Sequence, residues 1–358
     1  MAKYTIREAN DDDIRGIAKL RLRIKEFQLT GEDEYTLFWK SFINDNPCSI
    51  KKALIAVNDQ NRVVAHYAMV PFKFLKDEKL LMGGFVCQLM VDEDYRQEFI
   101  FPKMMLKMLK EYKDLGVDFA YSLSNRSEIV KAHQSFGFCK IGDSVVHAKP
   151  YNLIKIVQHL TKNRLLNIIM TPALFIAQKL LRLKRTAGKG NVVLREIYKF
   201  DSAIDRFLSE IQRHFPYGIQ RDSAFLNWRT VDSGGRKYRI FIAEEGGNIT
   251  GYVILRAMKM KQFDILAIVD IMFSPERHDV GKALLDSVHE VALQLNVDIS
   301  NCLLNPHDPL YPIIKKHGYF KTPESISLFT HEPKGAGHEF SENSFDKWHI
   351  TWLDHDSV

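Results

Sequence analysis

Apolar residues recur along the chain with two spacings, which predict alternating strands and helices. Helical spacing is clearest after Phe101, where apolar side chains follow at Met105, Met108, Leu109, Tyr112 and Leu115. Short apolar runs bounded by turn-forming residues predict strands over 63–70, 85–91 and 117–123. Residues 128–135 predict a short helix that ends near Gly137. The order of these elements indicates a mixed α+β domain.

The same pattern occurs twice. Residues 5–9 resemble residues 193–197, and Phe136-Gly137-Phe138 resembles His317-Gly318-Tyr319. Together with two further matches, these pairs keep the same order at a nearly constant offset. We therefore expect two tandem domains of one fold, each a mixed, mostly antiparallel sheet flanked by helices. The predicted boundaries are 1–150 for the first domain, 151–190 for a basic helical linker and 191–358 for the second domain.

Composition narrows the protein class. The 358 residues are 46% hydrophobic and 26% charged, which is typical of a globular protein. The four cysteines lie far apart without the spacing of metal ligands or of a disulfide framework, so we expect no metal site. No apolar leader follows Met1, and a cytoplasmic protein is the expectation.

The net charge of +6 is unevenly distributed, since residues 151–190 hold eight Lys or Arg and no Asp or Glu. We therefore expect no nucleic-acid partner. The uncharged run 165–178 is shorter than the ~20 residues that span a bilayer, and Pro172 interrupts it. Two interpretations stay open: a helical hairpin buried between the domains, and a peripheral contact with the inner face of the membrane.

Several residues together resemble the GNAT (GCN5-related) acetyltransferases. They are Ile6-Arg7-Glu8-Ala9, Val91 with Tyr95-Arg96, Asn125, and Gly137-Phe138. The family pattern Q/R-x-x-G-x-G/A falls on residues 96–101, and on residues 277–282 in the second copy. The whole chain is similar to two-domain GNAT proteins often associated with bacterial surface-polysaccharide genes.

The resemblance implies that acetyl-CoA is the cosubstrate and that the first domain binds it. Leu89, Met90 and Val91 would bind the pantetheine arm, and Asn125 would make a further coenzyme contact. The pyrophosphate would lie on the loop formed by Arg96, Gln97, Glu98, Phe99, Ile100 and Phe101. Phe99 replaces the central glycine, and a bulky residue at positive φ costs roughly 1–2 kcal/mol.

The resemblance also suggests catalytic candidates. The glutamate that often serves the family as a base is absent from the strand 85–91, where Gln88 would orient a water molecule. His133 stands where a general acid is common, and the Val91 N–H would stabilise the oxyanion. In the second domain, Asp270 within an apolar run would be either a base or a hydrogen-bonded structural carboxylate. Cys87 as an acyl carrier is a weaker alternative, because cysteines in apolar strands are usually packing residues.

These observations predict an N-acyltransferase that moves an acetyl group from acetyl-CoA to an amine of a small molecule, such as an amino sugar, in a ternary complex. The segment with Tyr217, Arg221, Trp228 and Arg229 would bind a sugar or form core. Two alternatives remain: a Fem-type aminoacyl transferase, and an inactive GNAT-like binding or scaffold protein. The second alternative arises because both loops lack the key glycine.

Overall fold

A computed structural model describes residues 4–24, 31–161, 164–181, 191–232, 234–333 and 340–356. It divides into two compact units that interleave along the chain. Unit 1 contains residues 1–143, 216–237 and 326–348, and unit 2 contains residues 144–215, 238–325 and 349–358.

The sheet of unit 1 is mostly antiparallel, with one parallel pairing between β4 and β5. Its strand order is β1-β2-β3-β4-β5-β13, and β8 pairs with the end of β3. The strands are β1 (Tyr4–Glu8), β2 (Lys52–Asn58), β3 (Val63–Lys76), β4 (Lys79–Val91), β5 (Phe119–Ser124), β8 (Tyr217–Ile219) and the second half of β13 (Phe320–His331).

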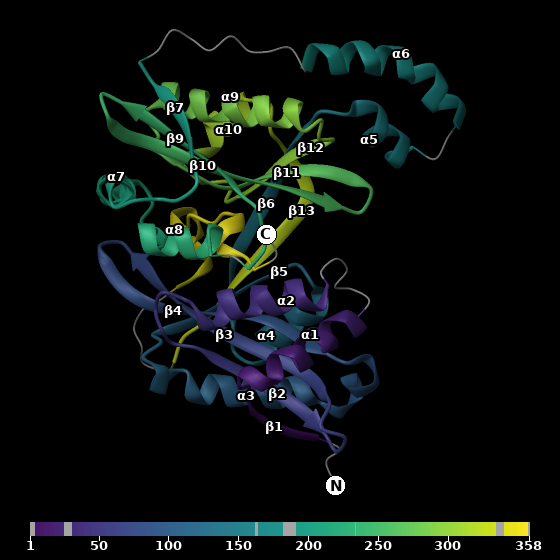
Figure 1. Cartoon of the computed structure of the whole chain (residues 1–358), viewed down its shortest axis with the longest axis vertical. Helices are drawn as coiled ribbons and strands as arrows, with labels where there is room; N and C mark the ends of the chain where they lie inside the picture. Colours follow the sequence, from purple (N-terminus) through teal and green to yellow (C-terminus); the bar gives the residue numbers. More distant parts are fainter. Residues whose placement is uncertain are drawn as a thin grey trace. The chain divides into compact units, whose positions relative to one another are not determined.

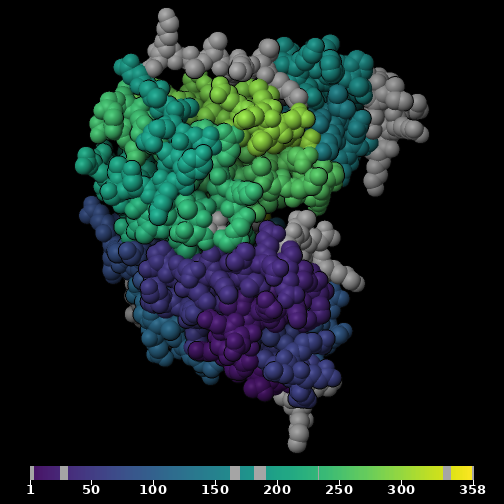
Figure 2. Space-filling view, in the orientation of Figure 1, coloured from purple at the N-terminus to yellow at the C-terminus, as the bar shows by residue number. Residues whose placement is uncertain are grey.

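Helices cover both faces of this sheet (Figure 1). They are α1 (Ile14–Arg23), α2 (Glu32–Trp39), α3 (Ile100–Glu111), α4 (Ser127–Ser135) and α8 (Ser223–Thr230). Neighbouring residues of a strand point to opposite faces. On β3, Tyr67 contacts Met105 of α3, and His66 contacts Trp39 of α2. Helices α2 and α3 therefore lie on opposite faces of the sheet. The purple surface in Figure 2 belongs to the N-terminal residues, which include α1 and α2.

The helical spacing read from the sequence is confirmed in α3. Met105, Met108 and the following Tyr112 are buried in the core of unit 1, together with Tyr67 and Val86. This packing fixes the start of α3, which borders the candidate site described below.

Helix α8 also packs into unit 1. The indole of Trp228 stacks on Phe42 at 5.5 Å and donates a hydrogen bond to the carbonyl of Ser41 (2.6 Å). Trp228 is only 3% exposed, and Arg229 lies over the ring of Phe42. The segment with Trp228 and Arg229 is therefore part of the core. This is the second of the two roles considered for it, sugar binding or core packing.

Unit 2 has the same sequence of pairings, with strand order β6-β12-β11-β10-β9-β7 and a parallel pair between β11 and β12. The strands are β6 (Cys139–Pro150), β7 (Val193–Ile197), β9 (Arg239–Glu245), β10 (Asn248–Met260), β11 (Phe263–Phe273) and β12 (Ile299–Leu304). The helices are α5 (Leu153–Leu160), α6 (Arg164–Leu181), α7 (Ala203–Ile211), α9 (His278–Gln294) and α10 (Tyr311–Lys316).

The predicted fold class is confirmed: a mixed sheet flanked by helices. The compact units are not contiguous stretches of the chain, however, because each sheet receives a strand from the other half of the chain. Residues 327–331 of β13 pair with β5, and residues 145–150 of β6 pair with β12. A repeat in sequence identifies equivalent segments but not the sheet that each strand joins. The division into functional domains at 150 and 190 stays a prediction.

The predicted linker contains helices α5 and α6 in its described part. Among the described residues, no helix has the length and apolar character needed to cross a membrane. Both interpretations of this segment, the buried hairpin and the peripheral membrane contact, stay predictions.

Candidate active site

Strand β4 is interrupted by a β-bulge at Gln88. His66 of β3 pairs with Met90 of β4, and Ala68 pairs with Cys87. Between these pairs, two residues of β4, Gln88 and Leu89, therefore face one residue of β3. Gln88 has a φ of 53°, in the left-handed region that favours glycine. The parallel ladder with β5 covers only Gly83 to Phe85 of β4. Beyond the bulge, β4 continues through Leu89, Met90 and Val91. These residues lie outside the ladder with β5, so β4 has an edge there.

A short turn, Glu93–Glu98, joins β4 to α3 and ends at Phe99. Phe99 has φ 53° and ψ 33°, and the residue is 72% exposed. The bulky residue at positive φ that the sequence predicted is therefore present. Tyr4 donates a hydrogen bond to the carbonyl of Glu98 (3.0 Å), which secures the loop to β1. Pro102 is the third residue of α3 and has no N–H, so the amides of Ile100 and Phe101 are the donors at the first two helical positions.

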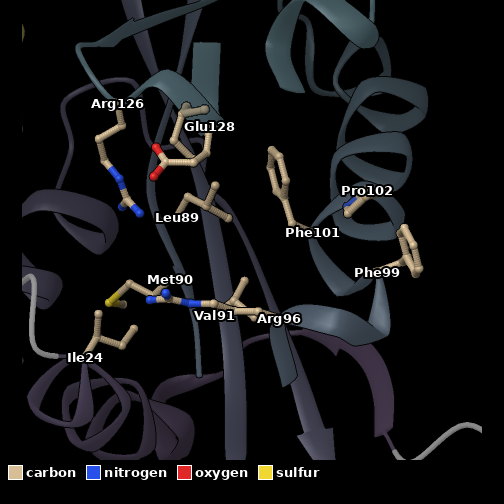
Figure 3. Close-up of a pocket in the computed structure, with 11 residues that line it drawn as sticks. Ile24, Leu89, Met90, Val91, Arg96, Phe99, Phe101, Pro102, Arg126 and Glu128 are labelled. Carbon is tan, nitrogen blue, oxygen red and sulfur yellow. The ribbon is translucent and has the colours of Figure 1, made fainter. Parts of the chain in front are cut away.

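A cavity of about 300 Å³ lies between the bulged end of β4, this loop and the start of α4 (Figure 3). Its lining comprises Ile24, Leu89, Met90, Val91, Arg96, Phe99, Phe101, Pro102, Arg126, Glu128 and Ile129. Six of the residues predicted for the coenzyme line it: Leu89, Met90, Val91, Arg96, Phe99 and Phe101. The structure thus brings the predicted strand and the predicted loop together at one cavity.

The other predicted coenzyme residues do not belong to this lining. Ile100 is buried beneath the loop and contributes to the core. Gln97 and Asn125 are exposed, and Glu98 is partly exposed. Asn125 lies between β5 and α4, next to a residue that does line the cavity, Arg126.

Three charged side chains belong to the lining. Arg96 comes from the turn before α3, whereas Arg126 and Glu128 come from the start of α4 (Figure 3). Neither α4 residue is among those predicted from the sequence, and their position directly after Asn125 is the signal that could have indicated them. Two arginines beside the start of a helix favour an anionic ligand such as a phosphate group. The carboxylate of Glu128 is a group that can accept a proton.

His133 does not line the cavity. It is 2% exposed and lies against Phe138 and Phe329, with its Nδ1 2.7 Å from the carbonyl of Ile129. Because burial disfavours the charged imidazolium, the pKa of His133 lies below its ordinary value. This environment gives no support to the predicted general-acid role, which requires contact with the reacting atoms.

Asp270 is fully buried in unit 2. Its carboxylate accepts hydrogen bonds from the Tyr252 hydroxyl (2.6 Å) and the Thr351 hydroxyl (2.8 Å). These contacts agree with the structural alternative for this residue rather than with a base in contact with substrate.

Gln88 lies at the bulge rather than in the cavity lining. Its side-chain oxygen accepts a hydrogen bond from the Tyr35 hydroxyl (2.7 Å), which directs the amide toward α2. Among the described residues, no cluster of three or more His, Cys, Asp or Glu side chains is arranged to hold a metal ion.

Comparison with known proteins adds a family match over the first part of the chain. Residues 5–139 match the family model of the acetyltransferase (GNAT) domain. This range contains the bulged strand, the loop, α3 and α4. No curated protein matches the sequence.

Solved structures resemble almost the whole chain in fold. A GCN5-related N-acetyltransferase from Anabaena variabilis has a TM-score of 0.63 at 10% identity, covering 91% of this chain and 72% of that one. An N-myristoyltransferase of Saccharomyces cerevisiae with bound myristoyl-CoA has a TM-score of 0.66 at 12% identity, covering 93% and 79%. A GCN5-related N-acetyltransferase from Kribbella flavida has a TM-score of 0.58 at 14% identity, covering 91% and 70%.

The family match and the fold agree with the site, because the cavity lies entirely within the matched range. Residues 5–139 thus match the GNAT acetyltransferase domain, and the fold of the chain resembles that of solved N-acyltransferases.

Proposed function

We propose that this protein transfers an acetyl group from acetyl-CoA to an amine of a small molecule, by direct attack in a ternary complex. The observation that carries the proposal is the cavity of unit 1. It joins the edge of β4 beyond the bulge to a strand-to-helix loop, and two arginines line it.

Each part of the lining has a role in this proposal. The backbone of Leu89, Met90 and Val91 offers hydrogen-bonding groups along an edge that the β5 ladder does not cover, which suits the amides of the pantetheine arm. Arg96 and the first amides of α3 suit the pyrophosphate. Arg126 adds a second cation, which offsets the amide that Pro102 cannot supply.

The proposed reaction needs few groups. The neutral amine attacks the thioester carbonyl, and the Val91 N–H stabilises the oxyanion that develops. The tetrahedral intermediate then collapses, the carbon–sulfur bond breaks, and coenzyme A leaves as a thiolate that takes up a proton. Glu128 is the carboxylate in the cavity lining, and we propose that it accepts the proton of the amine.

In the equivalent loop of unit 2, the arginine at the corresponding position is held by carboxylates. There, Arg277 forms ion pairs with Asp279 (2.7 Å) and Glu245 (2.9 Å). These carboxylates already neutralise the arginine that would face a pyrophosphate.

The test is a thiol-release assay with acetyl-CoA and a panel of amines that includes free and nucleotide-linked amino sugars. Amine-dependent release of coenzyme A, with a product heavier by one acetyl group, would support the proposal. Activity that requires aminoacyl-tRNA instead would favour the Fem-type alternative. No transfer from either donor, despite a folded protein, would favour a binding or scaffold role.

A further inference from the structure

A buried hydrogen-bond chain holds the β4 bulge from the side of α2. We propose that His66, in its Nδ1–H tautomer, is a positioning residue that fixes the Gln88 carbonyl and thereby directs Leu89, Met90 and Val91 into the cavity. The coenzyme part of this inference rests on the proposed function, whereas the effect on the bulge does not.

The contacts of His66 are short and enclosed. Its Nδ1 lies 2.9 Å from the carbonyl oxygen of Gln88, and its Nε2 lies 3.1 Å from the indole nitrogen of Trp39. His66 is fully buried, and Trp39 is 2% exposed. Water therefore does not compete with either hydrogen bond, and loss of one would leave a buried polar group unsatisfied.

These two partners determine the tautomer. A carbonyl oxygen can only accept a hydrogen bond, so Nδ1 must carry the proton. An indole N–H can only donate, so Nε2 must be the unprotonated acceptor. Trp39 thus fixes the form of His66 that can hold Gln88.

The bulge is the part of β4 that needs such support. Gln88 is a non-glycine residue at φ 53°, a conformation that persists only where its surroundings enforce it. Two of its groups are held from the same face of the sheet: His66 binds the carbonyl, and the Tyr35 hydroxyl binds the side-chain oxygen at 2.7 Å. Leu89 is the next residue, and it lines the cavity.

Helix α2 contributes to both supports: Tyr35 binds Gln88 directly, and Trp39, four residues further on the same face, holds His66. The end of α2 continues into a turn that contains Phe42, and Trp228 of α8 stacks on that ring at 8°. The shape of the cavity edge is therefore set from the face of the sheet opposite α3. No pattern along the chain indicates this role, since a single histidine in an apolar strand is usually a packing residue.

Hydrogen–deuterium exchange on the ligand-free protein tests the positioning role directly. The variants are His66→Leu, which removes both bonds, and His66→Asn, whose amide nitrogen can occupy the place of Nδ1. Tyr112→Phe is the matched control, because it deletes one hydrogen bond of unit 1 (3.1 Å to His331) at the far end of α3. We expect faster exchange over residues 86–92 in His66→Leu, restoration in His66→Asn, and no change there in Tyr112→Phe.

Acetyl-CoA affinity provides the second measurement. We expect His66→Leu to raise the Kd about tenfold, His66→Asn to stay within about threefold of the wild type, and Trp39→Phe to lie between them. If His66→Leu does not fold, Trp39→Phe and His66→Asn still give the comparison. Exchange over residues 86–92 that is unaffected in every folded variant of His66 and Trp39 would overturn the inference. If the wild-type protein binds no acetyl-CoA, the proposed function fails, and the exchange data still decide the role of His66.

Discussion

The strained residue at the start of α3 allows a quantitative test of the loop geometry. Phe99 occupies the left-handed region at φ 53° and ψ 33°, where the GNAT pattern has glycine. The residue is 72% exposed, so truncation of its side chain removes little packing. Phe99→Gly relieves the backbone strain, whereas Phe99→Ala removes the same ring and keeps a Cβ. The difference between the two variants isolates the cost of the backbone conformation.

The magnitude follows from two opposing terms. A residue with a Cβ in this region costs about 1–2 kcal/mol relative to glycine. Glycine in turn lowers the folding stability by about 0.4–1 kcal/mol, because it leaves the unfolded chain more flexible. We therefore expect Phe99→Gly to be more stable than Phe99→Ala by about 0.5–1 kcal/mol.

The assay is urea unfolding of both variants, followed by fluorescence and circular dichroism so that separate transitions of the two units would be seen. Leu106 provides the control, since it is 48% exposed within α3 and has ordinary helical geometry. There, glycine should be less stable than alanine by about 1 kcal/mol. Equal or lower stability of Phe99→Gly compared with Phe99→Ala would refute the assigned loop conformation.

Three further predictions concern a buried histidine and two carboxylates. Burial lowers the pKa of His66 from its ordinary 6.5 to about 4. The buried neutral imidazole therefore contributes its full stabilisation to the folded protein above pH 6.5, and this stabilisation is lost as the pH falls toward 4. The unfolding free energy of the wild type should therefore fall by about 3 kcal/mol more than that of His66→Asn between pH 6.5 and 4, and parallel curves would contradict this. Glu128→Gln should lower kcat at least about tenfold and leave the Kd for acetyl-CoA unchanged, and an unchanged kcat would exclude its proposed role. Asp270→Leu leaves the Tyr252 and Thr351 hydroxyls without their acceptor, so it should destabilise the protein by about 2 kcal/mol or more. Its affinity for acetyl-CoA should stay unchanged. Loss of affinity in a protein of unchanged stability would contradict a structural role.

Local features of the fold could be predicted from the sequence. The helical period after Phe101 correctly places Met105 and Met108 in the core, because a one-sided apolar pattern has one favourable burial. The glycine pattern likewise placed Phe99 at a position of positive φ. These predictions depend on residues within a few positions of one another.

Features that depend on distant residues could not be predicted. Arg126 and Glu128 reach the cavity because α4 starts beside the edge of β4, and no local signal shows which side chains a cavity will expose. The role of His66 requires Trp39, 27 residues away in sequence. The exchange of β6 and β13 between the units depends on pairings that a repeat cannot reveal.

The central claim is that the cavity of unit 1 binds acetyl-CoA, and calorimetric titration tests it most directly. The protein would be titrated with acetyl-CoA beside two charge-reversal variants: Arg96→Glu at the cavity, and Lys110→Glu at the exposed far end of α3. We predict one site per chain with a micromolar Kd, lost in Arg96→Glu and kept in Lys110→Glu. No binding by the wild type at millimolar acetyl-CoA, or equal binding by all three proteins, would contradict the account.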